Sequence, residues 1–435
     1  METTVTKLTL ANGLQVFLKE IHTAPIISHW VWYRVGSRDE QAGITGISHW
    51  VEHMQFKGTS KYPAGVLDKA ISRVGGMWNA STYMDWTTYF ETVPAAEIEL
   101  ALDLEADRMV NSLFRSEDVA SERTVIISER QGNENEPLFR LGEEVQSAAF
   151  LIHSYHHEVI GEMVDLQTMG RDDLFRHYRS YYVPNNALLG VAGDFDTGQM
   201  LERIRHHFEA IPQGSEPVRL KRPEPAQTGE RRLVVEGPGE TTYLMVVYHV
   251  PQASHPDFFP LMVLSSLLTG ASSLSLFGGG ISNKTSRLYR ALIDHDLAVG
   301  VHGGVQATID PYLYTITVTI HPQSEPDRAL AAIDDEIHRL QDRPPSAQEL
   351  ERALKQARAL FAYGSESISN QAFWLGFAEM YASYDWFTGF LDNLVSVSPL
   401  DIQRVAQAYL LRQNRVVGIY HPTGQPTGDE GEEAE

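Results

Sequence analysis

The chain has 435 residues, of which 43% are hydrophobic, and it is too long for a single hydrophobic core, so we expect two or three domains. Its formal net charge of −22 argues against nucleic-acid binding, because phosphates repel such a surface. It has no cysteine, which excludes disulfides and thiolate metal ligands, and no apolar run approaches the length of a membrane span.

The N-terminal segment predicts location and the first strands. Residues 1–7 contain no basic stretch followed by an apolar core, so we expect no secretory signal and a cytoplasmic protein. Residues 8–18 alternate around Asn12-Gly13, which predicts a β-hairpin. Residues 26–35 alternate as well and predict another strand.

Residues 46–56 predict an amphipathic helix that ends at Gly58 and carries an H-x-x-E-H motif. His49 and His53 are four residues apart, so they lie on one helix face about one turn apart. Two such imidazoles can bind one zinc ion, and Glu52 beside them can take a proton from water. The motif therefore predicts one catalytic Zn²⁺ per chain, with Glu52 as the base.

The next segments group strands with strands and helices with helices: strands at 77–82 and 86–93, then helices at about 95–112 and 116–133. The last of these helices carries Glu122 and Glu129, seven positions apart and thus on one face. A catalytic zinc ion takes three protein ligands, and we predict Glu129 as the third. Glu122 would orient a ligand from outside this set, although a solvated acidic stripe is the ordinary alternative for such glutamates.

Two segments are diverged copies of each other. Five identities recur 228 positions later without a gap: Asp173, Arg176, Tyr181, Asn186 and Gly190 recur as Asp401, Arg404, Tyr409, Asn414 and Gly418. Each copy predicts a helix, a turn and a strand. From the repeat we predict a zinc-binding catalytic domain at 1–211, a linker at 212–229, a homologous domain without metal at 230–423 and a disordered acidic tail at 424–435.

These motifs together resemble those of the pitrilysin-type (inverzincin) zinc metallopeptidases, which include the insulin-degrading and mitochondrial processing peptidases and bacterial two-subunit relatives. The resemblance covers nearly the whole chain and is carried by residues 36–40, 46–59 and 75–82, by Tyr89, and by Glu122 with Glu129. In that family a glutamate 76 positions after the second histidine binds the zinc, which is the separation of positions 53 and 129.

The resemblance implies an α+β fold of two related domains, each a mainly antiparallel sheet packed with helices. In this family the domains face each other like a clam shell around a cavity that holds peptides or unfolded segments. The grouping of strands and helices along the chain also favours α+β over alternating βαβ units. By the same resemblance, Asn79 and Ala80 would bind an extended substrate through backbone hydrogen bonds.

The second half of the chain departs from the family pattern. The family supplies there an arginine and a tyrosine, seven apart, that hold the substrate near the zinc. Here Val299 stands at the tyrosine position, and the arginine position holds Leu292 or, with one deletion, Ile293. Arg287 and Arg290 are out of register. We therefore expect a homologous subunit to supply the pair, which makes this chain the metal-bearing subunit of a heterodimer.

Two other functions share part of these features. A non-catalytic scaffold subunit of the same fold, as in respiratory complexes, typically has a damaged metal motif, whereas this motif is intact. A quorum-signal lyase also carries an H-x-x-E-H-like motif, but it is much smaller and uses a cysteine, which this chain lacks. The sequence thus favours a zinc-dependent endopeptidase.

Overall fold

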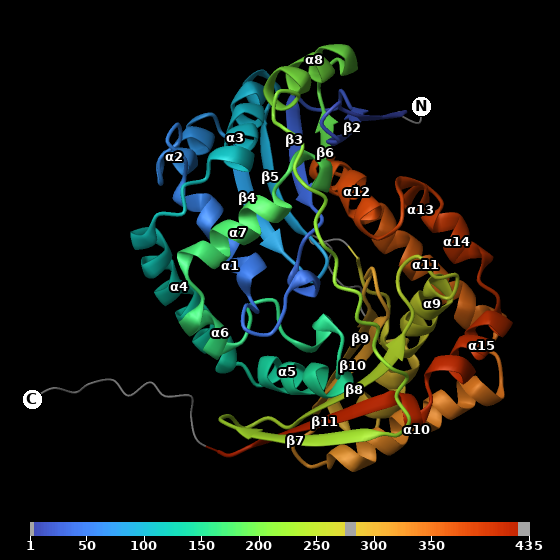
Figure 1. Ribbon diagram of the computed structural model, residues 1–435. Coiled ribbons are helices and arrows are strands. Elements are labelled where there is room, and N and C mark those ends of the chain that lie inside the picture. Colours follow the sequence, from blue (N-terminus) through green and yellow to red (C-terminus); the bar gives the residue numbers. More distant parts are fainter. Residues whose placement is uncertain (1–3, 275–283, 425–435) are drawn as a thin grey trace, which may run out of the picture. The chain divides into compact units, whose positions relative to one another are not determined.

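The computed structural model describes residues 4–274 and 284–424 (Figure 1). The predicted acidic tail therefore lies, apart from Gly424, outside the described residues. The chain forms two compact units, each assembled from three stretches: unit 1 from Met1–Glu129, His157–Arg222 and Ser365–Thr388, and unit 2 from Arg130–His156, Pro223–Gly364 and Gly389–Glu435.

Within the described residues, unit 1 contains one six-stranded sheet of order β1-β2-β6-β3-β5-β4. Its strands are β1 Val5–Thr9, β2 Gln15–Glu20, β3 Ile26–Tyr33, β4 Met77–Thr82, β5 Thr87–Pro94 and β6 Ala187–Gly193. Neighbouring strands are antiparallel except β2 and β6, which are parallel. The strand β4 forms one edge, so its outer backbone groups can pair with an added strand.

The helices that belong wholly or mainly to unit 1 are α1 Ile47–Met54, α2 Val66–Arg73, α3 Ile98–Asn111, α4 Ser116–Glu134, α6 Met163–Thr168, α7 Arg171–Tyr181, α8 Thr197–Phe208, α12 Ile368–Tyr381 and α13 Tyr384–Thr388. Short 3₁₀ turns join several of them: η1 Ser37–Asp39, η2 Gln55–Lys57, η3 Ala95–Glu97 and η5 Pro184–Asn186. The predicted hairpin, the motif helix and the strand and helix pairs that follow it are all present, with ends shifted by at most a few residues.

Helix α12 covers one face of the unit 1 sheet, although it comes from the second half of the chain (Figure 1). It packs against β3 and β6, where Phe373 meets Trp30 edge-on with ring centroids 5.5 Å apart. Trp30 also stacks on Phe90 of β5 at 4.1 Å. Gly376 lies against the indole of Trp32, so a side chain there would push the helix off the sheet.

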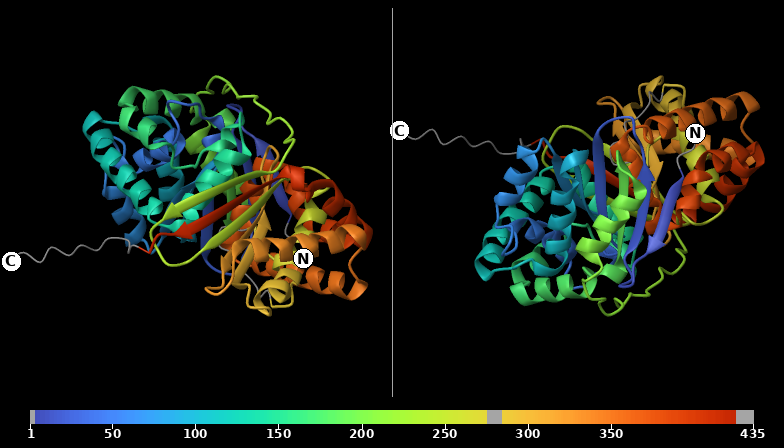
Figure 2. Two further views of the ribbon diagram at one scale, coloured as in Figure 1. Left: turned by 90° about the horizontal axis from the view of Figure 1, so that it is seen from below. Right: turned by 90° about the horizontal axis from the view of Figure 1, so that it is seen from above.

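Unit 2 contains, among the described residues, a five-stranded sheet of order β7-β11-β8-β10-β9. Its strands are β7 Arg231–Gly237, β8 Tyr243–Val250, β9 Ala298–Val305, β10 Tyr312–Ile320 and β11 Arg415–Pro422. The parallel pair β7 and β11 lies side by side although far apart in sequence, as the left view of Figure 2 shows.

The helical segments of unit 2 are α5 Pro137–Ala149, η4 Ser154–His156, α9 Phe258–Thr269, the π-helical turn η6 Tyr289–Ile293, α10 Pro326–Asp342, α11 Ala347–Tyr363, α14 Phe390–Ser396, α15 Pro399–Tyr409 and η7 Arg412–Asn414. Helix α5 packs on β7, β8 and β11, although it comes from the first half of the chain. Each unit therefore takes one covering helix from the other half of the sequence.

The structure confirms the predicted repeat. Helix α7 and strand β6 recur 228 positions later as α15 and β11, and η5 recurs as η7. The sheets repeat as well: β2-β6-β3-β5-β4 and β7-β11-β8-β10-β9 have the same order and the same strand directions.

The recurring identities have a local structural role. Asp173 and Asp401 each accept a hydrogen bond, 3.0 Å long, from the backbone N–H three residues earlier and so close the start of a helix. Asn186 and Asn414 each donate to the carbonyl five residues earlier, at 2.8 and 2.9 Å, before a strand begins. These side chains fix the helix–strand turn, which explains why they survive in both copies.

The predicted domain boundaries follow the sequence repeat, whereas the compact units interleave through α5 and α12. The predicted linker, residues 212–229, contains no helix or strand. Among the residues that the structure describes, no helix is both long and apolar enough to cross a membrane.

Candidate metal centre

The motif helix α1 begins at a backbone position that only glycine fits well. Gly46 has φ +83° and touches the backbone at Ile160 and Gly161, where a Cβ atom would overlap the Ile160 carbonyl oxygen. The carboxylate of Glu40 accepts hydrogen bonds from the N–H groups of Gly46 and Ser48, both 2.8 Å long. The buried Glu40 side chain thus satisfies two backbone donors at the helix start and fixes α1 in place.

The structure brings His49, His53 and Glu129 together. One ligand atom from each lies within 4.8 Å of the others. Nε2 of His49 is 3.8 Å from Glu129 Oε1, and Nε2 of His53 is 3.7 Å from Glu129 Oε2. These gaps are too long for hydrogen bonds. They approach the ~3.4 Å that separates ligand atoms around a tetrahedral ion with bonds of about 2.1 Å.

The donor chemistry also fits zinc, which accepts imidazole nitrogen and carboxylate oxygen. The two histidine side chains are mostly shielded, while that of Glu129 is 41% exposed, so the group opens to solvent on the Glu129 side. Three protein ligands with an open side are typical of a catalytic rather than a structural zinc site.

The second ring nitrogen of His53, Nδ1, contacts a carboxylate outside the ligand group. Nδ1 lies 2.8 Å from Oε1 of Glu122, which leaves Nε2 turned toward Glu129. The other oxygen of Glu122 forms an ion pair with Lys57. The side chain of Glu122 is buried on α4, so this glutamate is not part of a solvated acidic stripe.

Burial and neighbouring charges shape the pKa values of the group. Burial, together with the nearby His53, lowers the pKa of His49 to about 3. Burial alone would lower the pKa of His53 too, but its hydrogen bond to Glu122 and the surrounding carboxylates raise that pKa above its ordinary value. Burial raises the pKa of Glu52 to about 7, against the opposing effect of the His53 charge.

Glu52 lies on α1 with 8% of its surface exposed. The hydroxyl of Thr82, at the end of β4, donates a 3.2 Å hydrogen bond to its Oε2. This contact links the motif helix to the edge strand β4.

The predicted substrate-binding residues lie on that strand. Asn79 is exposed, whereas Ala80 is half-buried. The backbone N–H of Ala80 donates to the side-chain oxygen of Asn79 at 2.9 Å. The side chain of Asn79 therefore pairs with a backbone donor of the edge strand β4.

The positions at which the sequence resemblance places the family's arginine and tyrosine lie in unit 2 and carry apolar side chains. Val299 on β9 is 56% exposed, while Leu292 on η6 is buried. Ile293 ends η6.

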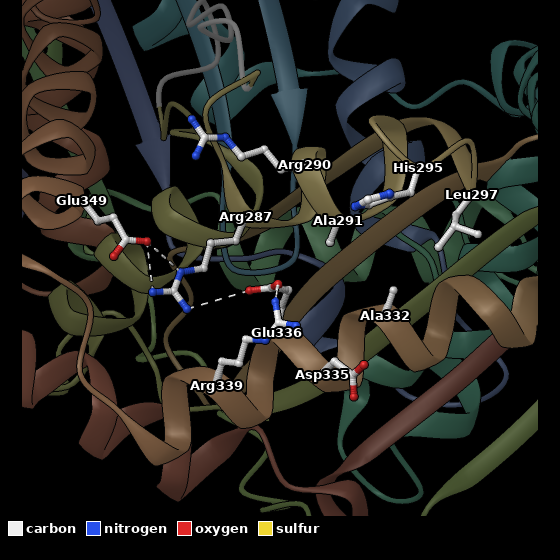
Figure 3. Close-up of a pocket in the computed structure, with 10 residues that line it drawn as sticks. All are labelled: Arg287, Arg290, Ala291, His295, Leu297, Ala332, Asp335, Glu336, Arg339 and Glu349. Carbon is white, nitrogen blue, oxygen red and sulfur yellow. Dashed lines mark hydrogen bonds and ion pairs between the residues drawn. The ribbon is translucent and has the colours of Figure 1, made fainter.

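The two arginines near this segment line a pocket of about 630 Å³ in unit 2 (Figure 3). Arg287 is held by Glu349 at 3.0 Å and by Glu336 at 3.9 Å. Arg290 is exposed and points away from this group in Figure 3. Arg287 is therefore held by two carboxylates within unit 2.

Sequence reasoning assigned no role to Lys57 or Thr82, although both lie in the stretches that carry the resemblance. Lys57 stands four positions after His53, so the helical spacing of the motif offered one signal for it. The contact of Thr82 with Glu52 joins strand to helix, and no periodicity in the sequence reports such a contact.

Family models and individual proteins match the chain over both halves. The model described as Insulinase (Peptidase family M16) matches residues 15–162, and the one described as Peptidase M16 inactive domain matches residues 168–357. Zinc protease PqqE of Helicobacter pylori is 35% identical over 266 residues, which are 60% of this chain and 60% of that protein. The match thus covers only three fifths of the length of that relative.

Two further matches extend over nearly the whole chain. The mitochondrial-processing peptidase subunit beta of Lentinula edodes is 26% identical over 413 residues, covering 92% of this chain and 86% of that protein. The crystal structure of a protease from Helicobacter pylori aligns with a TM-score of 0.89 and 28% identity, covering 97% of this chain and all of that one.

Proposed function

The chain belongs to peptidase family M16, the insulinase family, and from that membership we propose that it is a zinc-dependent endopeptidase that cleaves peptides or unfolded segments. The observation that carries the proposal is the meeting of His49, His53 and Glu129 beside Glu52. The relatives named zinc proteases support the same metal.

The three ligand residues would hold one zinc ion through Nε2 of each histidine and one oxygen of Glu129. When bound, the ion supplies a Lewis acid that polarises the scissile carbonyl and acidifies the attacking water. The protein contributes the fixed geometry: α1 sets the two imidazoles one turn apart, and Glu122 keeps Nδ1 of His53 occupied.

Glu52 is the proposed general base. Its Oε2 accepts the Thr82 hydrogen bond, which leaves Oε1 as the oxygen that takes a proton from water and returns it to the leaving amine. The contact with β4 fixes the carboxylate relative to the strand where the substrate is proposed to bind.

The edge strand β4 would bind the substrate as an added strand. A substrate carbonyl would replace the side-chain oxygen of Asn79 at the N–H of Ala80. Because main-chain atoms make this contact, it suits many sequences provided that the peptide is extended.

A homologous subunit would complete the site. Val299 and Leu292 have no hydrogen-bonding side chain, so they cannot stabilise a developing oxyanion. The similarity to a mitochondrial-processing peptidase subunit supports a two-subunit arrangement, with this chain as the metal-bearing member. The scaffold alternative has less support, because the ligand group is complete here.

The test pairs two substitutions in the full chain, assayed alone and as the complex co-purified from the native host. Glu52→Gln should keep zinc and lose at least ~10²-fold in hydrolysis of an unstructured fluorogenic peptide, because an amide cannot accept the proton. His49→Ala should lose zinc, because two protein ligands rarely hold it tightly.

Glu117→Gln, at an exposed position on α4, is the matched control and should change neither property. Full zinc occupancy in His49→Ala would contradict the ligand assignment. Hydrolysis within a few-fold of wild type in Glu52→Gln would contradict the role of the base, and a wild-type complex that cleaves no peptide would contradict the function itself.

A further inference from the structure

Lys57 contacts the candidate metal ligands indirectly, through Glu122. Lys57 ends the turn η2, four positions after His53, and its ammonium group forms an ion pair with Oε2 of Glu122. Oε1 of the same carboxylate contacts Nδ1 of His53 at 2.8 Å. Glu122 thus has one oxygen for each partner, and its side chain is only 6% exposed.

Two anchors hold a carboxylate more firmly than one. A carboxylate that contacts only His53 could rotate about its last bond, whereas the Lys57 contact fixes the plane of the group. Fixing that plane fixes the imidazole as well, so that Nε2 of His53 faces Glu129 across 3.7 Å.

We propose that Lys57 is a positioning residue of the metal site, which strengthens zinc binding by holding Glu122 against Nδ1 of His53. The inference rests on the proposed function, since it concerns the same metal ligands. It acts through two side chains and does not require Lys57 to touch metal or substrate.

Simple electrostatics makes the opposite prediction. Lys57 carries a positive charge close to a site for a dication, so its removal should relieve repulsion and tighten zinc binding. The proposed positioning role predicts weaker binding instead. The sign of the change therefore separates the two effects.

The experiment measures the zinc affinity of the metal-stripped full chain by competition with a chromogenic chelator, without any activity assay. Lys57→Met and Lys57→Gln should each bind zinc about tenfold more weakly than wild type, in the range found for groups that support metal ligands. Lys57→Arg, which can pair with a carboxylate, should stay within about threefold. Unfolding curves of the metal-free proteins check that each variant folds. If one of the two neutral variants does not fold, the other still tests the proposal.

Lys61→Met is the matched control. Lys61 is a nearby lysine that pairs with Asp103 at 2.6 Å, and its removal should leave zinc affinity unchanged. In a Glu122→Gln background, Lys57→Met should weaken zinc binding by less than about twofold, because the intermediary is already altered.

Equal or tighter binding in both neutral Lys57 variants overturns the proposal, as does a full effect of Lys57→Met in the Glu122→Gln background or a similar loss in Lys61→Met. A wild-type chain that binds no zinc would instead overturn the proposed function, so the two failures are distinguishable.

Discussion

His177 is a buried histidine behind the motif helix. It lies on α7, which packs against α1, and its Nε2 is 3.3 Å from the hydroxyl of Ser48. Burial lowers its pKa from 6.5 to about 4, although the negative charge of Glu40 opposes the shift. The residue next to a metal ligand is therefore contacted by an imidazole that stays neutral at physiological pH.

This shift predicts a pH dependence of stability. The pKa of His177 is lower in the folded protein than in the unfolded chain, so between pH 6.5 and 4 the unfolded chain binds more protons. The stabilising contribution of the neutral His177 is fully present above pH 6.5. As the pH falls from 6.5 to 4, the free energy of unfolding decreases by up to about 3 kcal/mol. Urea unfolding of the metal-free chain between pH 7.5 and 4 measures it.

His177→Gln should lose less stability over the same pH range, because glutamine does not titrate. His206→Gln, at an exposed position, should give the same pH dependence as wild type. Parallel curves for wild type and His177→Gln would show that His177 does not account for the acid sensitivity.

At the scale of elements, the site depends on how α1 is placed against its surroundings. The helix supplies two ligands and the base within one and a half turns, but its position is set from outside. Glu40 caps its first turn, and the backbone at Ile160 and Gly161 approaches Gly46 closely. A displaced helix start would shift both imidazoles relative to α4.

Gly46→Ala should therefore destabilise the protein by at least ~2 kcal/mol, from the strain of a positive φ plus the overlap with Ile160. It should also weaken zinc binding. Gly43→Ala is the matched control, since Gly43 has φ +97° but open space where its Cβ would lie. Chemical unfolding and zinc competition measure both variants.

The control should lose only the strain, about 1 kcal/mol, and keep its zinc affinity. If the two substitutions cost the same, the close approach at Gly46 contributes nothing to the placement of α1.

At the scale of the whole molecule, the chain contains two copies of one sheet topology, and among the described residues the candidate metal ligands belong to unit 1. The second copy keeps the side chains that fix the helix–strand turn, such as Asp401 and Asn414. It has Val299 and Leu292 where the family pattern has a tyrosine and an arginine. The strand order is thus the same in both units, whereas the metal ligands lie on unit 1.

We therefore expect the pure chain to hydrolyse peptides weakly and a homologous subunit with the arginine and tyrosine to stimulate it. Each oxyanion donor can contribute ~3 kcal/mol in the transition state, so stimulation should reach at least ~100-fold. The measurement compares initial rates of the chain alone and of the chain mixed with its candidate partner.

Partner variants in which the tyrosine is changed to phenylalanine or the arginine to alanine should fail to stimulate. Full activity of the pure chain, unchanged on mixing, would mean that Val299 and Leu292 reflect sequence drift.

The sequence by itself determined the features that depend on local spacing. His49 and His53 share a helix face because four residues make about one turn, and Glu122 and Glu129 share one because seven make about two. The hairpin around Gly13 and the helix–strand repeat are equally local, since turn residues and capping side chains act within a few positions. The prediction of Glu129 as the third ligand was supported by the 76-residue separation in the family resemblance, because no local rule links residues so far apart.

Only the tertiary structure decided which distant groups meet. It placed Lys57 on Glu122, Thr82 on Glu52 and Glu40 at the start of α1. In the structure α12 packs on the sheet of unit 1, and α5 packs on the sheet of unit 2. Amphipathic and apolar patterns report that a helix must be buried but not which sheet face is left open for it. Which sheet face a helix covers depends on segments that are distant in sequence. The close contacts at Gly46 and Gly376 likewise form only when such segments meet.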